Sequence, residues 1–322
     1  MLKSFPARLS RRPSLAFVLL CAFFAVLWLA GGATRPDVLG QVVVRLAAVI
    51  SLCILALFGD FPSIAQARPI WWLLSVVIGL TAVQLIPLPP PLWQALPGRA
   101  LFLNATLGQP QPWRPLAIVP GTAMNALMSL IVPLTTLWLA SNIRSDERTL
   151  VPGVILIMVA ASNLFALMQF SGGGLGNPFI NDSASEISSS FANRNHFALF
   201  LALGCLLVPA WVFARGSRSR GRALIGLGVA LLFLLTILAT GSRSGILLGA
   251  VALGTSIIIA RGSIKQALKQ APRWALPAVL VTVIGVIVAT VMISIAADRA
   301  VSIQRVFAVD TGQDMRNRAL PT

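Results

Sequence analysis

Phe191-Ala192-Asn193-Arg194-Asn195-His196-Phe197-Ala198 lies where a segment rich in glycine and serine gives way to a long apolar run. A second polar stretch, Thr240-Gly241-Ser242-Arg243-Ser244-Gly245, separates two further apolar runs. Each stretch puts one arginine, Arg194 or Arg243, at the start of a hydrophobic segment. The remainder of the chain is interpreted as scaffolding that brings these two arginines to one membrane surface.

The composition predicts an integral membrane protein. Of the 322 residues, 57% are hydrophobic and only 11% are charged, whereas a soluble globular domain carries roughly 25% charged residues. The net charge of +16 would suggest nucleic acid as the partner of a soluble chain. Here the cations lie between apolar runs and indicate topology instead, so no nucleic-acid binding is expected. The three cysteines lie inside apolar runs without metal-ligand spacing, which indicates packing roles.

The apolar runs predict an all-α, polytopic membrane helix bundle of about nine spans, because a membrane helix needs about 20 apolar residues. The expected spans are residues 14–33, 38–59, 70–90, 122–141, 150–170, 195–214, 223–240, 245–260 and 274–296. The first span follows a basic segment and could be a signal peptide. We favour an uncleaved anchor because of its length and because Trp28 marks its far end.

Basic residues concentrate in alternate connections, which is the positive-inside pattern of membrane proteins. The connections expected on the inner side contain Arg68, Arg144, Arg148, Arg215, Arg218, Arg220, Arg222, Arg261, Lys265, Lys269 and Arg273. This pattern predicts a cytoplasmic tail at 1–13, a membrane domain at 14–297 and the start of a large periplasmic loop at 298–322. Trp93 is expected near an outer membrane boundary as an interfacial anchor.

Three segments on the predicted outer side are longer than simple turns. Residues 87–120 are rich in proline, which excludes a regular helix. Residues 171–192 contain runs of glycine and serine. Residues 298–322 are charged and the sequence stops within them, so we expect an external loop that is incomplete.

Arg194 and Arg243 occupy positions that are unfavourable for cations. Both precede spans that run inward from the predicted outer face, and a helix N-terminus carries free N–H groups and the positive end of the macrodipole. A guanidinium group forms bidentate hydrogen bonds with phosphate oxygens, and a helix N-terminus itself binds anions. One interpretation is a diphosphate-binding site at the outer surface. The other is that both arginines bond lipid phosphates or nearby carbonyl groups.

Polar residues beside the two arginines allow a catalytic or a structural interpretation. His196 is the only histidine of the chain and could act as a general base, or it could orient the loop and cap the helix. Asn193 and Asn195 are expected to cap the helix start. Ser242 is expected to support the second turn in a similar way.

Three further residues are candidate binding groups. Arg45 lies inside the second span, where a charge suggests function, including diphosphate binding, although snorkelling to the headgroups is the alternative. Asp182 and Glu186 could bind a metal, but two carboxylates in a loop are more typical of a solvated segment. No metal or other cofactor is therefore expected.

A glycine repeat around the start of the eighth span predicts a packing surface. Gly241, Gly245 and Gly249 recur at a spacing of four, which allows a neighbouring helix to approach closely. Arg243 lies on the opposite face at 100° per residue, so it is expected to point away from that surface.

At the two polar stretches the sequence resembles the O-antigen ligase and polymerase family of bacterial envelope glycosyltransferases. The first stretch is similar to the family's F-x-N-R-N-H-F-A entry to a membrane helix. The second is similar to its T-x-S-R-G/S-G turn, and Arg243 with Leu247 fits its R-x-x-x-L spacing. The resemblance covers about residues 151–318, and the proline-rich segment also looks like the family.

The resemblance implies a C-type membrane glycosyltransferase in the bacterial inner membrane. Such enzymes take glycan from undecaprenyl diphosphate at the periplasmic face, without a metal or a nucleotide sugar, and join it to a glycan, lipid A-core or other acceptor hydroxyl. Arg194 and Arg243 would hold the diphosphate. The family also carries a large outer loop with a proposed general-base histidine and further helices. The sequence departs there, since only Asp314-Met315-Arg316 resembles the start of that loop.

Two other functions remain in competition with this one. A translocator of lipid-linked glycans would place charges near the bilayer midplane on broken helices, often in repeated halves. The distinctive arginines lie instead at one predicted surface, and no repeat is visible. The other alternative is a truncated, non-catalytic remnant of the enzyme.

Overall fold

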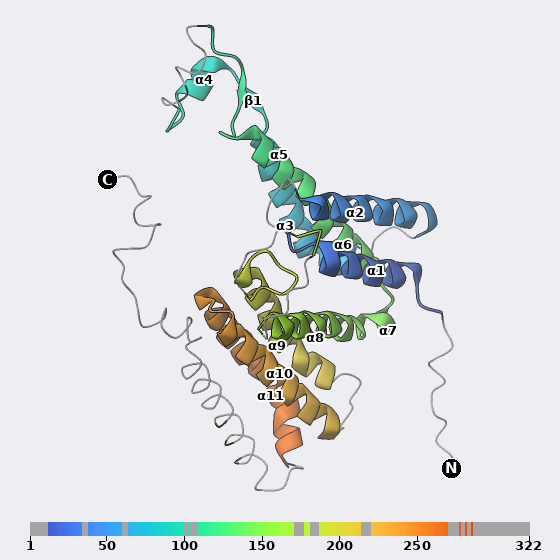
Figure 1. Ribbon diagram of the computed structural model, residues 1–322. Helices are drawn as coiled ribbons and strands as arrows, with labels where there is room; N and C mark the ends of the chain where they lie inside the picture. Colours follow the sequence, from blue (N-terminus) through green and yellow to red (C-terminus); the bar gives the residue numbers. More distant parts are fainter. Residues whose placement is uncertain are drawn as a thin grey trace, which may run out of the picture. The chain divides into compact units, whose positions relative to one another are not determined.

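The structure is a computed structural model that describes residues 12–33, 38–59, 64–99, 102, 109–170, 177–180, 187–213, 220–269, 277, 281 and 285 (Figure 1). Two compact units divide the chain. The first comprises Met1–Leu27 and Gln41–Glu147, and the second comprises Trp28–Gly40 and Arg148–Thr322.

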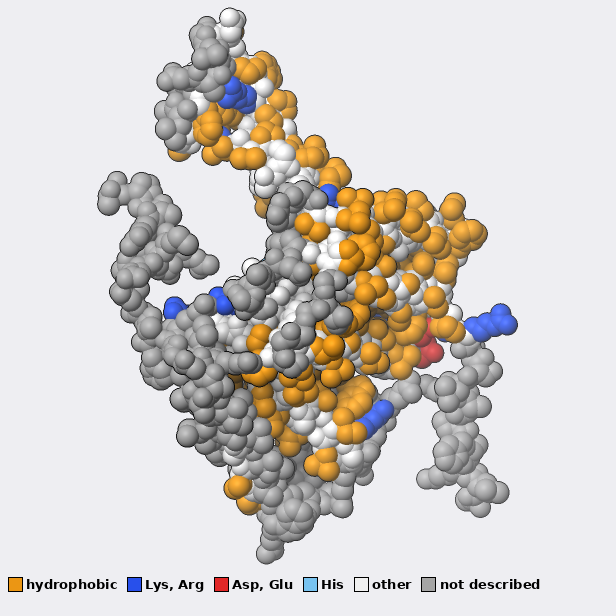
Figure 2. Space-filling view, viewed as in Figure 1, with side chains coloured by type: hydrophobic (Ala, Val, Ile, Leu, Met, Phe, Trp, Pro, Cys, Tyr) orange, Lys and Arg blue, Asp and Glu red, His pale blue; other side chains and the backbone are white. Residues whose placement is uncertain are grey.

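Six helical segments in the described part of the chain are long and apolar enough to cross a membrane. They are Leu39–Phe58, Pro120–Asn142, Ser145–Phe170, Arg194–Val212, Gly221–Ala239 and Arg243–Gly262. Hydrophobic side chains cover much of the visible described surface (Figure 2), and Phe58 and Ile259 are 76% and 75% exposed. Helices that are apolar on their outer faces are typical of membrane proteins. The chain therefore has the architecture of a helical, multi-pass membrane protein.

The first unit contains most of α1 (Leu15–Ala30), most of α2 (Leu39–Phe58), α3 (Ile64–Val83), α5 (Pro120–Ser129), α6 (Ile131–Asn142) and most of α7 (Ser145–Arg148). Two prolines of this unit interrupt helical structure. Pro133 cannot donate to the carbonyl group of Ser129 and crowds it, and α5 gives way to α6 at Leu130, which has φ −68° and ψ −10°. Pro69 accompanies a kink in α3, where Ala67 has the non-helical angles φ −111° and ψ 17°.

The proline-rich segment of this unit forms a small ribbon. Strand β1 (Pro87–Leu88) pairs antiparallel with β2 (Arg114–Pro115), so that Leu88 lies opposite Arg114. The short helix α4 (Pro90–Gln94) begins with prolines, which suit the first turn because the N–H group of that position has no helical partner. As predicted, this segment is not a single regular helix.

A buried carboxylate fixes the start of α1. Glu147 is 5% exposed, and it accepts hydrogen bonds from the Ser14 backbone N (2.7 Å) and the Ser14 Oγ (2.5 Å). The Arg144 Nη2 donates to it at 2.7 Å. A buried charge needs such pairing to be tolerated, so these contacts tie α7 to the beginning of α1.

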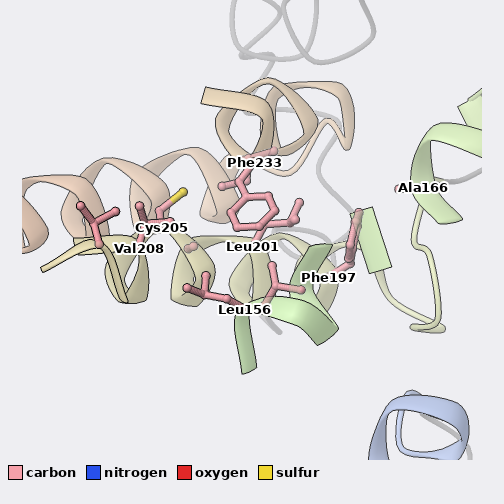
Figure 3. Packing of buried hydrophobic residues seen from close by; sticks show 11 residues of the cluster. Leu156, Ala166, Phe197, Leu201, Cys205, Val208 and Phe233 are labelled. Atoms are coloured by element: carbon pink, nitrogen blue, oxygen red, sulfur yellow. The ribbon is translucent and has the colours of Figure 1, made fainter. Parts of the chain in front are cut away.

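The second unit is built around α9 (Arg194–Val212), which packs against α8 (Val151–Phe170), α10 (Arg220–Ala239) and α11 (Arg243–Lys269). The core residues of α9 recur at intervals of three or four, as one face of a helix requires. They are Phe197, Leu201, Cys205 and Val208, which meet Leu156 of α8 and Phe233 of α10 (Figure 3). A Cβ atom at Gly204 would lie 2.7 Å from side-chain atoms of both Phe233 and Val159, so glycine permits this close packing.

Eight of the nine predicted spans fall on helices of the described chain, and six of these helical segments are long and apolar enough to cross a membrane, but the boundaries differ in places. The third span was predicted at 70–90, yet α3 ends at Val83 because the chain then enters the ribbon. Helix α11 continues to Lys269, beyond the predicted end at 260. The predicted count of nine stays a prediction, because most of 274–296 and all of 298–322 lie outside the described residues.

Candidate functional site

The first polar stretch forms the N-terminus of α9, and Arg194 is the first residue of that helix. Asn193 is its N-cap, with the extended angles φ −131° and ψ 120°. The Asn193 Oδ1 accepts a hydrogen bond from the Asn195 backbone N at 2.8 Å, which satisfies one of the free donors of the first turn. His196 also lies in this turn, and its backbone N donates to the Asn193 carbonyl group.

The second polar stretch forms the turn between α10 and α11. Gly241 has φ +67°, a left-handed conformation that glycine adopts without steric cost after a helix. Helix α11 then begins at Arg243. The Ser242 Oγ accepts a hydrogen bond from the Gly245 backbone N at 2.9 Å. Ser242, which is 1% exposed, therefore caps α11 as Asn193 caps α9.

A side-chain hydrogen bond joins the two stretches. The Ser242 Oγ donates to the Asn195 Oδ1 at 2.7 Å, so one hydroxyl group both caps α11 and binds the first turn of α9. One turn further along, a Cβ atom on Gly245 would lie 2.5 Å from the Ala198 Cβ. The helix starts are therefore held together, and each arginine is the sequence neighbour of a residue in this bond.

The turn before α9 is held by Gln169, a residue that the sequence interpretation did not single out. Its Oε1 accepts hydrogen bonds from the backbone N atoms of Ser188 (3.2 Å) and Ser189 (2.8 Å). Its Nε2 donates to the Ser189 carbonyl group at 3.1 Å. Ser189 has φ +55°, which is uncommon for a residue other than glycine. The sequence signal that could have identified this residue was a polar glutamine in the last turn of the otherwise apolar helix α8.

Residues at the end of α1 and just after it support the same turn. The Gly32 carbonyl group accepts a hydrogen bond from the Ala192 backbone N at 2.9 Å. A Cβ atom at Gly32 would lie 1.9 Å from the Ser190 carbonyl oxygen, so only glycine fits this contact. The Trp28 Nε1 donates to the Ser162 Oγ at 2.7 Å, and the Ser189 Oγ donates to the Ser162 carbonyl group at 2.6 Å. The turn before Arg194 is therefore held by Trp28 at the end of α1, by Gly32 and by α8.

The electrostatic character of this site is basic. Arg194 is half-buried, whereas Arg243 and His196 are exposed. Residues 187–297 contain no aspartate or glutamate, and the N-termini of α9 and α11 add the positive ends of two helix dipoles. A surface of this kind attracts anions, and guanidinium groups bind those with several oxygens.

Arg45 lies in the first unit and has partners within it. Its Nη2 donates to the Gln41 Oε1 (2.9 Å), the Asn125 Oδ1 (2.5 Å) and the Ser129 Oγ (2.8 Å). These contacts link α2 to α5. Neither diphosphate binding nor snorkelling is needed to account for this arginine, and its predicted contact with a diphosphate stays a prediction.

The predicted glycine surface is partly wrong. Gly241 precedes α11 and shapes the turn by its positive φ, so it is not on a helix face. Gly245 approaches Ala198 of α9, whereas a Cβ atom on Gly249 would lie 3.2 Å from Ile237 of α10. The two remaining glycines therefore face two different helices.

The two carboxylates considered as metal ligands, Asp182 and Glu186, lie outside the described residues. In the described part of the chain, no three histidine, cysteine, aspartate or glutamate side chains gather in a way that could hold a metal ion.

Comparison with known proteins gives no relative for this chain. No family model, curated protein or solved structure matches it.

Proposed function

We propose that the chain is a C-type membrane glycosyltransferase of the O-antigen ligase or polymerase type. In this proposal about nine spans lie in the bacterial inner membrane, with the N-terminus cytoplasmic and the C-terminus periplasmic. The substrate is a glycan on undecaprenyl diphosphate, and the acceptor is a hydroxyl group of a glycan, of lipid A-core or of a similar molecule.

The observation that carries the proposal is the hydrogen bond between Ser242 and Asn195. It joins the two stretches on which the family resemblance rests, although they are far apart in sequence. A diphosphate offers oxygens to two cations at once, so two arginine-bearing helix starts held together suit it better than they suit a single lipid phosphate.

The proposed reaction is a glycosyl transfer. The acceptor oxygen attacks the anomeric carbon, the bond from that carbon to the diphosphate oxygen breaks, and the diphosphate leaves with the bonding electrons. Negative charge grows on the leaving group, so Arg194 and Arg243 would stabilise the transition state more than the ground state. A base must take the acceptor proton. His196, exposed in the first turn of α9, is the candidate on this chain.

Binding of an undecaprenyl-diphosphate analogue to the purified full chain tests the proposal. Arg194→Ala and Arg243→Ala should each weaken binding by about tenfold or more, because a charge-assisted hydrogen bond contributes roughly 1.5–3 kcal/mol. The lysine variants keep the charge but lose the planar fork, and they should fall between wild type and alanine. Arg261→Ala, an exposed position on the same helix as Arg243, is the matched control and should bind like wild type.

Melting temperature separates lost binding from lost folding in these variants. Equal affinity in wild type and both alanine variants, at equal melting temperature, would contradict the diphosphate site. In vesicles, movement of the lipid-linked glycan across the bilayer without transfer to an acceptor would favour a translocator over an enzyme.

A further inference from the structure

A second cluster of cations lies in the proline-rich segment of the first unit. Trp93 of α4 is 4% exposed, although the sequence predicted an interfacial anchor there. Its Nε1 donates to the Pro115 carbonyl group at 3.0 Å, and its ring meets that of Phe102 edge-on with the centroids 6.4 Å apart. The indole is therefore the core of this small ribbon.

Two guanidinium groups stack on this one indole. The Cζ atoms of Arg99 and Arg114 lie 4.9 Å and 5.0 Å from the centroid of the Trp93 ring. Each contact is a cation–π interaction, which is favourable for a single cation. Two like charges beside one ring repel each other, however, and the ring alone cannot neutralise both.

Arg99 also has hydrogen-bonding capacity that the described residues leave unused. It is 5% exposed, and its Nη2 donates to the Leu116 carbonyl group. Its Nε and Nη1 are buried and have no hydrogen-bond partner among the residues that the structure describes. Burying charged donors without an acceptor is costly, so the arrangement calls for an acceptor that carries negative charge.

The surrounding sequence does not supply that charge. Residues 61–145 contain neither aspartate nor glutamate, so no carboxylate of the segment can pair with Arg99 or Arg114. An external anion with several oxygens fits the planar donors of a guanidinium group, and phosphate is the common example.

Exposed apolar side chains of the same segment indicate where this anion is presented. Leu92 of α4, Trp113 next to Arg114, and Ile118 are 53%, 64% and 53% exposed. Apolar and aromatic side chains next to cations are typical of surfaces that enter the headgroup layer of a bilayer.

We propose that Arg99 and Arg114, stacked on Trp93, bind the phosphate group of a membrane lipid headgroup. The site uses none of the residues of the proposed diphosphate site and lies in the other unit, so neither proposal depends on the other. Its function is to hold the proline-rich segment at the membrane surface through a lipid.

Native mass spectrometry of the full chain in detergent tests this site. The probes are phosphatidylglycerol and a diacylglycerol with the same acyl chains but no phosphate. Wild type should retain phosphatidylglycerol and not diacylglycerol. Arg99→Gln and Arg114→Gln should each lower the apparent affinity for phosphatidylglycerol by roughly tenfold, as expected for the loss of a charge-assisted hydrogen bond.

The matched control is Arg222→Gln, because Arg222 also stacks on a tryptophan, with its Cζ 5.4 Å from the Trp211 ring. It should retain the lipid as wild type does. Should Arg99→Gln fail to fold, the half-buried Arg114 supplies the decisive variant. Equal lipid retention in wild type and the folded variants would overturn the site. Tighter binding of inorganic phosphate than of phosphatidylglycerol would overturn the assignment to a lipid headgroup.

Discussion

The single hydroxyl group of Ser242 forms hydrogen bonds with two helices, α9 and α11. It donates to the Asn195 Oδ1 and accepts from the Gly245 backbone N. Ser242→Ala should lower the free energy of unfolding by about 1–2 kcal/mol, as is typical of a lost N-cap. It should also weaken binding of the diphosphate analogue, because α9 and α11 lose a link beside both arginines. Thermal unfolding and analogue titration measure the two effects.

Ser244→Ala is the control for this prediction. Ser244 is exposed and lies 3.2 Å from the Ser242 hydroxyl, Oγ to Oγ, so its loss should change stability by at most about 0.5 kcal/mol. A Ser242→Ala protein as stable as Ser244→Ala would show that the shared hydroxyl contributes nothing beyond an ordinary surface group.

The local part of this site could be predicted from the sequence, whereas the long-range part could not. An asparagine before an apolar run indicates an N-cap, because the interaction spans only two residues. The acceptor role of the Asn195 side chain depends on Ser242, and the roles of Gln169 and Gly32 depend on the turn before α9. Those contacts join segments whose approach is decided by helix packing, which residue types alone do not specify.

The close packing of α11 against α9 can be tested by substituting a glycine of α11. Gly245→Ala would place a Cβ atom 2.5 Å from the Ala198 Cβ, which forces the helices apart and should cost about 1–3 kcal/mol of stability. The same substitution at Gly254, also in α11, meets nothing within 4 Å. Gly254→Ala should stabilise the helix slightly, by up to about 1 kcal/mol. Melting temperatures of the two variants in one detergent make the comparison, and equal values would contradict the close approach.

Helix types were predictable from the sequence where apolar runs were long, but helix ends required the structure. Apolar runs alone do not show where α3 ends, since the proline-rich segment is also partly apolar. The early end at Val83 follows from pairing between Pro87–Leu88 and Arg114–Pro115. The break between α5 and α6 at Leu130 has a sequence signal in Pro133.

The distribution of basic residues along the entire chain predicts which connections face the cytoplasm. Fusion of a reporter after Gln111 should give a periplasmic signal, and fusion after Ser217 should give a cytoplasmic one. Both fusion points follow from the order of the predicted spans. A cytoplasmic signal at Gln111 would remove the argument for an external site, since it would invert the predicted orientation of α9 and α11.

The bond between Asn195 and Ser242 also has a consequence for the timing of biosynthesis. Its two partners are 47 positions apart, so the ribosome delivers the first helix start well before the second. Until α11 has been inserted, the Asn195 side chain lacks the partner that it has in the finished protein. An insertion intermediate that ends with α10 therefore holds one arginine-bearing helix start without its counterpart. Under the proposed function, the two arginine-bearing helix starts are therefore both present only after α11, the last of the four packed helices, has been inserted.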